Sequence, residues 1–321
     1  MPTETSTNIT SRPTGSALPA TPGGRTLLVA TDDTPASDPA LRLALALADE
    51  GVHVEAINVV DTRPMPIPPP LDTAIAFGDA VGGDAFRAGR EKDLRQRVSA
   101  ALNRPVDWPV RVALGTPANA IIRQAKRIHA DFILLGLRRH NVVERVAMDE
   151  TTEHVMRTAS CPVLAVAPTL GGLPRRAMVA VDFSQASLEA ARAADRLVGP
   201  DGTLVLAYVT PTAMSVADEG ERVIHELGVT SAFVWFRGEL ARAPGAPGAP
   251  VEQITLARGT TERVAEVLMS YADGASIDVI ALGSRRHGRI ERWMLGSVTT
   301  DIVRKGSRSM LVVPPNDRMS P

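Results

Sequence analysis

Three clusters in the C-terminal half of the chain have the residue types that hold a phosphate group. Asp182 and Ser184 follow a short apolar run, Gly283 ends another, and Gly296-Ser297 stands directly before an amphipathic segment. A glycine lets the backbone pass close to a ligand. The first turn of a helix offers unpaired N–H groups and a partial positive charge, and a serine there adds a hydroxyl. If the fold brings these clusters together, the chemistry that they favour is phosphate binding.

Other reactive side chains form no pattern of known chemistry. The only cysteine is Cys161, which excludes an internal disulfide and a zinc site built from cysteines. The histidines lack metal-ligand spacing, and we expect no resident metal. The patterns G-x-S-x-G, G-x-x-x-x-G-K-[ST] and G-x-G-x-x-G after a strand are absent. The sequence therefore supports no hydrolase triad, P-loop ATPase or dinucleotide dehydrogenase, and we name no catalytic residue.

Length and charge narrow the class of protein. A chain of 321 residues suggests two domains at about 150 residues each. Lys plus Arg is 35 and Asp plus Glu is 36, so the net charge of -1 gives no general basic field for nucleic acid or an anionic membrane. The first residues lack the basic start and apolar core of a signal peptide, and no run is long enough to span a bilayer. We expect a cytoplasmic protein with neither nucleic acid nor membrane as a partner.

The chain contains one sequence twice. Three blocks recur in the same order, which indicates an internal duplication. The matching pairs are Arg25–Ser37 with Arg176–Ser187, Phe132–His140 with Val279–His287, and Val155–Pro168 with Ile302–Pro315. We therefore predict a disordered tail over 1–24, a first domain over 25–168, a linker over 169–175 and a second domain over 176–315.

Each copy alternates short apolar runs with segments of helical composition. In the first copy the predicted strands are Leu27–Ala30, Val54–Val60, Val110–Leu114, Phe132–Gly136 and Pro162–Val166. Strands that alternate with helices form right-handed crossovers and a mainly parallel sheet with helices on both faces. Such sheets bind ligands at the carboxyl ends of their strands, where strand order reverses. Asp182, Gly283 and Gly296 are all predicted to lie at that edge.

Both halves resemble the universal stress protein family, in tandem. The resemblance is carried by Val179–Ser184 (V-A-V-D-x-S), Gly259-Thr260, Gly283 and Gly296-Ser297, and it covers the chain apart from its two ends. It implies two tandem doubly wound, Rossmann-like α/β domains, each with a five-stranded parallel sheet flanked by helices. It also implies that the two domains pack through their last strands.

The resemblance further implies a nucleotide site, because many members of the family bind ATP through the pattern G-x2-G-x9-G-[ST]. In the second copy Gly283 and Gly296-Ser297 match this pattern. The middle glycine is replaced by Arg286, and Gly288 follows two positions later. The arginine could pair with a phosphate or fill the space that a phosphate needs.

By the same resemblance, Asp182 lies near the nucleotide and the backbone of Val209 lies near adenine. The ligand would be ATP, with Mg²⁺ following it, or a related adenine nucleotide. The candidate binding residues are Asp182, Ser184, Val209, Gly283, Arg286, Gly288, Gly296, Ser297 and Val298.

The first copy departs further from the family pattern. Gly136 is kept, but Arg139 stands at the middle glycine and Asp149-Glu150 replaces the Gly-Ser pair. Two carboxylates at a helix start suit the helix dipole and repel a phosphate. The first domain is therefore predicted to be a degenerate half that keeps the fold and supplies an interface.

Three functions are compatible with the sequence. The first is a stress-response protein that senses an adenine nucleotide through its second domain and signals to an unknown protein partner. The second is a nucleotide-independent scaffold that acts by dimerising, and the third is a weak adenine-nucleotide hydrolase. Assembly could be a homo-oligomer or a pairing of the two domains within one chain.

Overall fold

The computed structural model describes residues 25–62, 84–137, 150–215, 217–242, 248–284, 296–305 and 308–315. The predicted tail (1–24) lies outside these ranges, as do Arg139, Asp149, Arg286 and Gly288. Among the helices within them, none combines the length and the apolar character that crossing a membrane requires.

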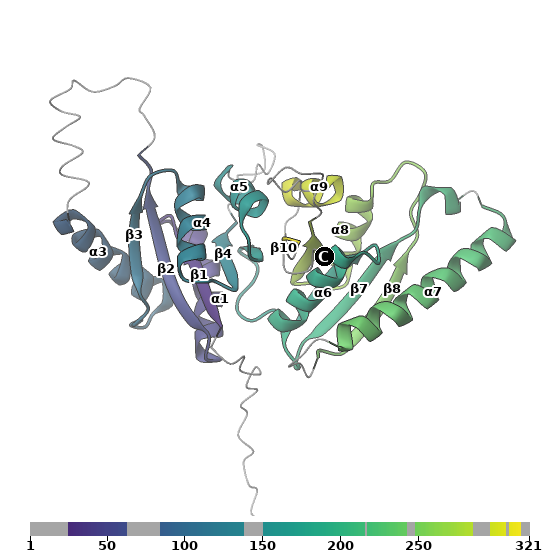
Figure 1. Ribbon diagram of the computed structural model, residues 1–321, viewed down its shortest axis with the longest axis horizontal. Coiled ribbons are helices and arrows are strands. Elements are labelled where there is room, and N and C mark those ends of the chain that lie inside the picture. The colour runs from purple at the N-terminus through teal and green to yellow at the C-terminus, as the bar shows by residue number, and fades with distance from the viewer. Residues whose placement is uncertain are drawn as a thin grey trace, which may run out of the picture.

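The two halves repeat one order of elements (Figure 1). The first half contains β1 (Thr26–Ala30), a 3-10 turn (Pro35–Ser37), α1 (Asp38–Asp49), β2 (His53–Val60), α3 (Asp84–Leu102), β3 (Val110–Leu114), α4 (Pro117–Arg127), β4 (Phe132–Gly136), α5 (Glu150–Thr158) and β5 (Val163–Val166). The second half contains β6 (Arg176–Val181), α6 (Gln185–Val198), β7 (Thr203–Val209), a 3-10 turn (Thr212–Ser215), α7 (Glu219–Ala241), β8 (Val251–Leu256), α8 (Val264–Gly274), β9 (Val279–Gly283), α9 (Ser297–Lys305) and β10 (Ser309–Val313).

The strands form a single 10-stranded sheet in the order β3-β2-β1-β4-β5-β10-β9-β6-β7-β8. Within each half all neighbouring strands are parallel. Strand order reverses beside β1 in the first half and beside β6 in the second. The predicted doubly wound α/β class with two tandem copies is therefore confirmed.

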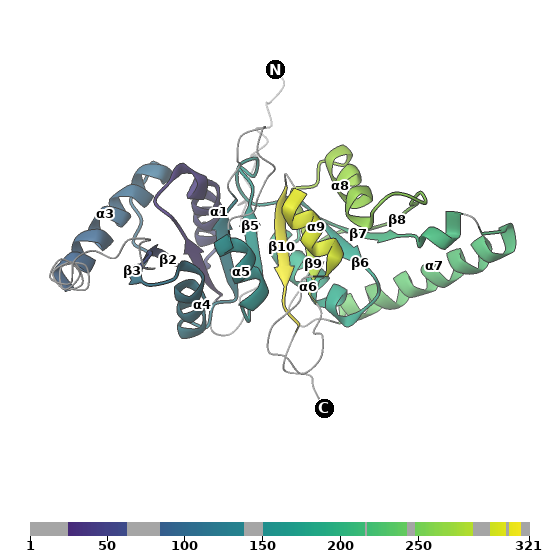
Figure 2. The same cartoon turned by 90° about the horizontal axis from the view of Figure 1, so that it is seen from above.

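The two halves join through their last strands. β5 and β10 pair antiparallel, with Leu164 opposite Leu311, and lie side by side at the centre of Figure 2. The hydroxyl oxygen of Ser309 accepts a hydrogen bond from the backbone N–H of Ala167 at 3.0 Å, in a buried position. The pairing that the family resemblance implied is thus present within one chain.

Apolar residues on both sides of each strand explain why helices cover both faces. In β1, Leu27 and Val29 belong to one core and Leu28 and Ala30 to the other, because successive side chains of a strand point to opposite faces. Helices α1, α3, α6 and α7 contribute to the first core, and α4, α5, α8 and α9 contribute to the second. Each core continues from one half into the other.

Candidate functional site

A cavity of about 540 Å³ opens at the carboxyl ends of β6 and β9, beside the start of α9. Sequence reasoning placed its candidate phosphate-binding residues at this edge. Six of the nine candidates line the cavity, namely Asp182, Ser184, Gly283, Gly296, Ser297 and Val298. The cavity also has apolar walls, which include Val264 of α8 and Leu282 of β9.

The other three candidates are not brought into this cavity by the described residues. Val209 ends β7 and packs half-buried against the core under α8 and α9, but it is not among the lining residues. Its counterpart in the first half, Val59, does line the corresponding pocket. Arg286 and Gly288 lie outside the described residues.

The turn after β6 fixes the only carboxylate among the described lining residues. The backbone N–H of Ser184 donates to Oδ1 of Asp182 at 3.1 Å, and the Ser184 hydroxyl donates to the same oxygen. The Ser184 hydroxyl oxygen also accepts the backbone N–H of Ser187 at 3.3 Å and so caps α6. The sequence predicted Asp182 and Ser184 as ligand-binding residues. The structure shows that Ser184 also caps α6, while Asp182 holds Ser184 in place.

The residue between them, Phe183, has a left-handed backbone with φ of 59°. This conformation is unfavourable for a bulky residue, so surrounding contacts must hold it. Its ring packs against Tyr208 at 5.2 Å and against Phe233 at 5.1 Å between centroids. Asp33 has the same left-handed backbone at the equivalent turn of the first half, with φ of 64°.

Gly283 has a packing role that the sequence did not indicate. A Cβ added to Gly283 would lie 2.2 Å from the carbonyl oxygen of Ala186, in the first turn of α6. In the first half, a Cβ added to Gly136 would lie at the same distance, 2.2 Å, from the carbonyl oxygen of Ala36. Gly283 therefore allows the end of β9 to touch the start of α6, and Gly136 allows the end of β4 to touch the 3-10 turn after β1. Both contacts exist whether or not a ligand is bound.

The start of α9 is the part of the cavity that suits an anion. Gly296 and Ser297 are exposed, and among the described residues, chain neighbours aside, no heavy atom lies within 4 Å of the place where a Cβ on Gly296 would be. The Gly296 carbonyl accepts the N–H of Thr300 at 2.9 Å, which is the first bond of the helix. The first turn of α9 contains no acidic residue. Unpaired N–H groups at such a terminus attract anions.

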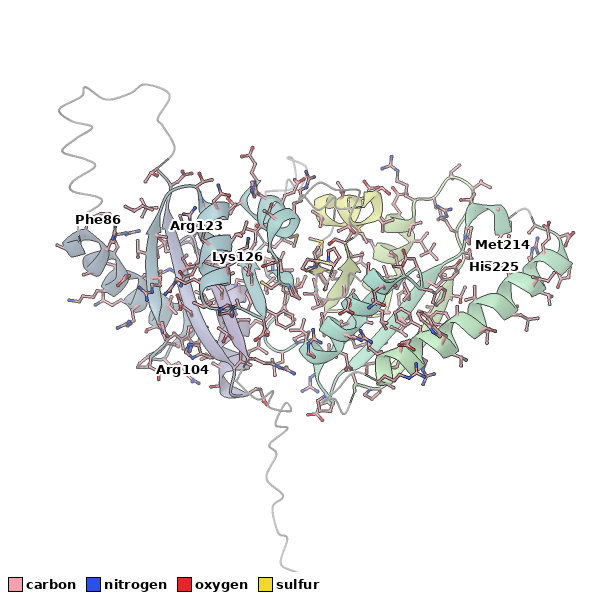
Figure 3. The ribbon with its side chains drawn as sticks, viewed as in Figure 1. Phe86, Arg104, Arg123, Lys126, Met214 and His225 are labelled. Atoms are coloured by element: carbon pink, nitrogen blue, oxygen red, sulfur yellow. The ribbon has the colours of Figure 1, made fainter. Side chains whose placement is uncertain are left out.

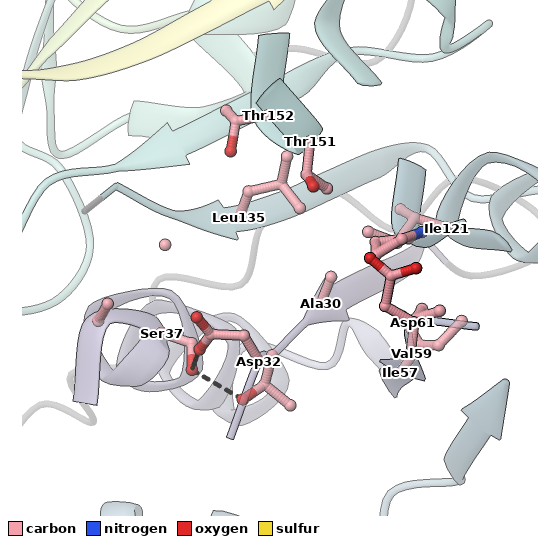
Figure 4. A pocket seen from close by; sticks show the side chains of 14 residues that line it. Ala30, Asp32, Ser37, Ile57, Val59, Asp61, Ile121, Leu135, Thr151 and Thr152 are labelled. Atoms are coloured by element: carbon pink, nitrogen blue, oxygen red, sulfur yellow. Dashed lines mark hydrogen bonds between the residues drawn. The ribbon is translucent and has the colours of Figure 1, made fainter. Parts of the chain in front are cut away.

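Figure 4 shows the corresponding pocket of the first half. It is smaller than the second-half cavity and has more carboxylates in its lining. It measures about 250 Å³ and is lined by the carboxylates of Asp32 and Asp61. Helix α5 begins at it with Glu150 and carries Glu153 in the same turn. Sequence reasoning missed Asp61. Its position just after the second strand was the available signal, since a strand's carboxyl end lies at the ligand-binding edge.

Two further features of the described residues concern metals and redox chemistry. No group of three or more His, Cys, Asp or Glu side chains within the described ranges is placed to hold a metal ion. Burial, with a smaller effect of Asp131, raises the pKa of the Cys161 thiol to about 12. A thiol with so high a pKa is poorly suited to nucleophilic or redox chemistry.

The two halves are doubly wound α/β domains in tandem. In the second half, the cavity at the carboxyl ends of the strands reaches the start of the last helix. The model of the universal stress protein family matches residues 24–167 and again residues 174–314. The chain therefore belongs to the universal stress protein family and contains two copies of its domain.

Known relatives agree with this assignment. A universal stress protein of Methanocaldococcus jannaschii is 28% identical over 145 residues, which are 44% of this chain and 80% of that protein. The crystal structure of a universal stress protein from Archaeoglobus fulgidus matches with a TM-score of 0.62 and 18% identity, over 91% of this chain and 99% of that chain. A protein of unknown function from Pseudomonas aeruginosa matches with a TM-score of 0.58 and 16% identity, over 92% and 94%. At such identities the structures show similarity of fold alone.

Proposed function

We propose that the second half of this universal stress protein binds ATP or a related adenine nucleotide, as a regulatory sensor. The observation that carries this proposal is the cavity of about 540 Å³ that joins Asp182, Gly283 and the start of α9. The open space at Gly296 leaves room for a phosphate beside the first turn of the helix. The resemblance to nucleotide-binding members of the family supports the choice of an adenine nucleotide.

The contrast between the halves supports one nucleotide per chain. The first-half pocket has less than half the volume, at about 250 Å³ against about 540 Å³, and is lined by two carboxylates. A triphosphate carries several negative charges, so it is repelled by Asp32, Asp61 and the acidic start of α5. We infer that the first half supports the fold and the joint, and that it takes no phosphate ligand.

The proposed mechanism is a shift between two states of the ligand edge. Mg²⁺ would accompany the phosphates, with Asp182 as the carboxylate in the cavity. The nucleotide would act on the segment that joins β9 to α9 and so change the surface that a protein partner meets. Such a shift requires that the nucleotide bind one state more tightly than the other.

Calorimetric titration with Mg-ATP tests this proposal. We would compare the unaltered chain with Gly296→Asp, which places a carboxylate at the expected phosphate position. Aspartate is a favourable residue at a helix start, so the variant should keep α9 intact while losing the nucleotide. The matched control is Gly171→Asp, the same change at an exposed glycine whose added Cβ would meet no heavy atom of the described residues within 4 Å, its chain neighbours aside.

Binding of one nucleotide by the unaltered chain and by Gly171→Asp, but not by Gly296→Asp, supports the proposal. Undiminished binding by Gly296→Asp would show that the nucleotide binds at another place in the molecule. No binding to the unaltered chain at millimolar Mg-ATP would refute the sensor and favour the dimerising scaffold. Phosphate release that is lost in Ser297→Ala would favour the hydrolase. A homodimer of tandem chains and a cytoplasmic location stay predictions.

A further inference from the structure

We propose that the second half has another ligand site, which takes a small organic anion with an apolar body. The site is a cleft of about 390 Å³ between α7 and β8, closed at one end by the segment after β7. It shares no lining residue with the cavity proposed for the nucleotide. A volume of this size falls in the range of about 300–1,000 Å³ typical of small-molecule sites.

The first observation is a pair of buried nitrogen atoms without partners. Nε2 of His225 and Nε of Arg258 are both shielded from solvent, and neither forms a hydrogen bond within the described part of the chain. Both residues line the cleft. Figure 3 shows His225 close to Met214 near the N-terminal end of α7. Buried polar groups normally have partners, so the wall of the cleft leaves the side chains of His225 and Arg258 incompletely hydrogen-bonded, and a ligand that drew either side chain toward it would relieve this.

The second observation is the balance of charge. Arg222 and Arg258 line the cleft, and neither guanidinium forms an ion pair among the described residues. Among the described residues that line the cleft, the one carboxylate is that of Glu226. Two guanidinium groups therefore face one carboxyl group in the described lining. Guanidinium groups bind carboxylates and phosphates through paired hydrogen bonds, so an anionic headgroup fits this end of the cleft.

The third observation is an apolar floor. Val229 and Phe233 of α7 are buried, with Phe233 only 2% exposed, and Met214 completes the apolar lining on the α7 side. This surface would receive a hydrocarbon or an aromatic ring, whereas a free inorganic anion would leave it empty. The polar rim adds the hydroxyls of Thr210, Thr230 and Thr255 and the amide of Gln253.

Titration with simple probes tests the site. The probes are 1-naphthoate and 1-naphthyl phosphate, with the uncharged 1-naphthylmethanol as their comparison. We expect saturable calorimetric binding of at least one anion, and binding of the alcohol at least tenfold weaker. Arg258→Gln and Arg222→Gln should each lower the affinity for the anion about tenfold, because each removes a charged hydrogen bond. The matched control is Arg237→Gln, an exposed arginine of the same helix outside the cleft, which should change affinity less than twofold.

The result does not depend on the proposed nucleotide site. Anion binding should persist in Gly296→Asp, and Mg-ATP binding, where present, should persist in Arg258→Gln. The proposal is overturned if neither anion binds at millimolar concentration, if the alcohol binds as tightly as the anions, or if Arg237→Gln weakens binding as much as Arg258→Gln. Loss of Mg-ATP in Arg258→Gln would also overturn it, because the cleft would then belong to the nucleotide site.

Discussion

Replacing Gly283 by alanine should destabilise the protein in the absence of any ligand. The added Cβ would lie 2.2 Å from the carbonyl oxygen of Ala186 and 2.4 Å from its carbonyl carbon. Contacts between a carbon and a carbonyl oxygen are normally about 3.3–3.6 Å, so β9 and the start of α6 must separate by roughly 1 Å. Overpacking of this kind costs about 1–3 kcal/mol of unfolding free energy.

The measurement is urea unfolding of the nucleotide-free protein, followed by circular dichroism. Gly136→Ala should behave alike, since its Cβ would meet the carbonyl oxygen of Ala36 at 2.2 Å. Gly238→Ala is the matched control. It lies in α7, and apart from the backbone of the helix itself no heavy atom of the described residues lies within 4 Å of its added Cβ, so alanine should stabilise the helix by up to about 1 kcal/mol. If Gly283→Ala unfolds like the unaltered chain and loses only nucleotide affinity, the packing argument is wrong.

Two further predictions concern buried groups away from the ligand edge. Ser309→Ala should lower the unfolding free energy by about 1–3 kcal/mol, because the buried N–H of Ala167 loses its acceptor. The control Ser231→Ala, at an exposed serine, should change the unfolding free energy by less than about 0.5 kcal/mol. If urea unfolding shows that Ser309→Ala and Ser231→Ala change this free energy equally, the argument is contradicted. Cys161, with its pKa raised to about 12, should react with iodoacetamide at pH 8 on the order of a thousandfold more slowly in the folded protein than in urea. Similar rates in both states would show that the thiol is not held in its protonated form.

The fold could be predicted from sequence because its signals are local and occur twice. Apolar runs such as Leu27–Ala30 are buried on both faces, which is the pattern of a central parallel strand. The repeated blocks then fixed the order of elements in both halves. The sequence analysis placed Gly296-Ser297 directly before the last amphipathic segment, and α9 begins at Ser297, a difference of one residue that is within the ordinary fraying of helix ends.

The candidate site was predictable only as far as strand ends could be located. Asp182, Gly283 and Gly296 meet because the carboxyl ends of parallel strands share one edge. The packing role of Gly283 depends on the approach of Ala186, which is distant in sequence, so no local pattern reveals it. The cleft under α7 was missed for the same reason, since Arg222 and Arg258 come from separate elements and match no motif.

The antiparallel joint of β5 and β10 has a consequence for how the two halves can change over evolutionary time. The segment between β5 and β6 tethers the partners, so their association is intramolecular and does not weaken when the protein is diluted. In a symmetric dimer every substitution appears on both sides of the twofold axis. Here each side is encoded separately, and a carboxylate such as Asp61 can occupy one ligand edge without appearing at the other. One chain can therefore hold two differently specialised edges in a fixed ratio of one to one.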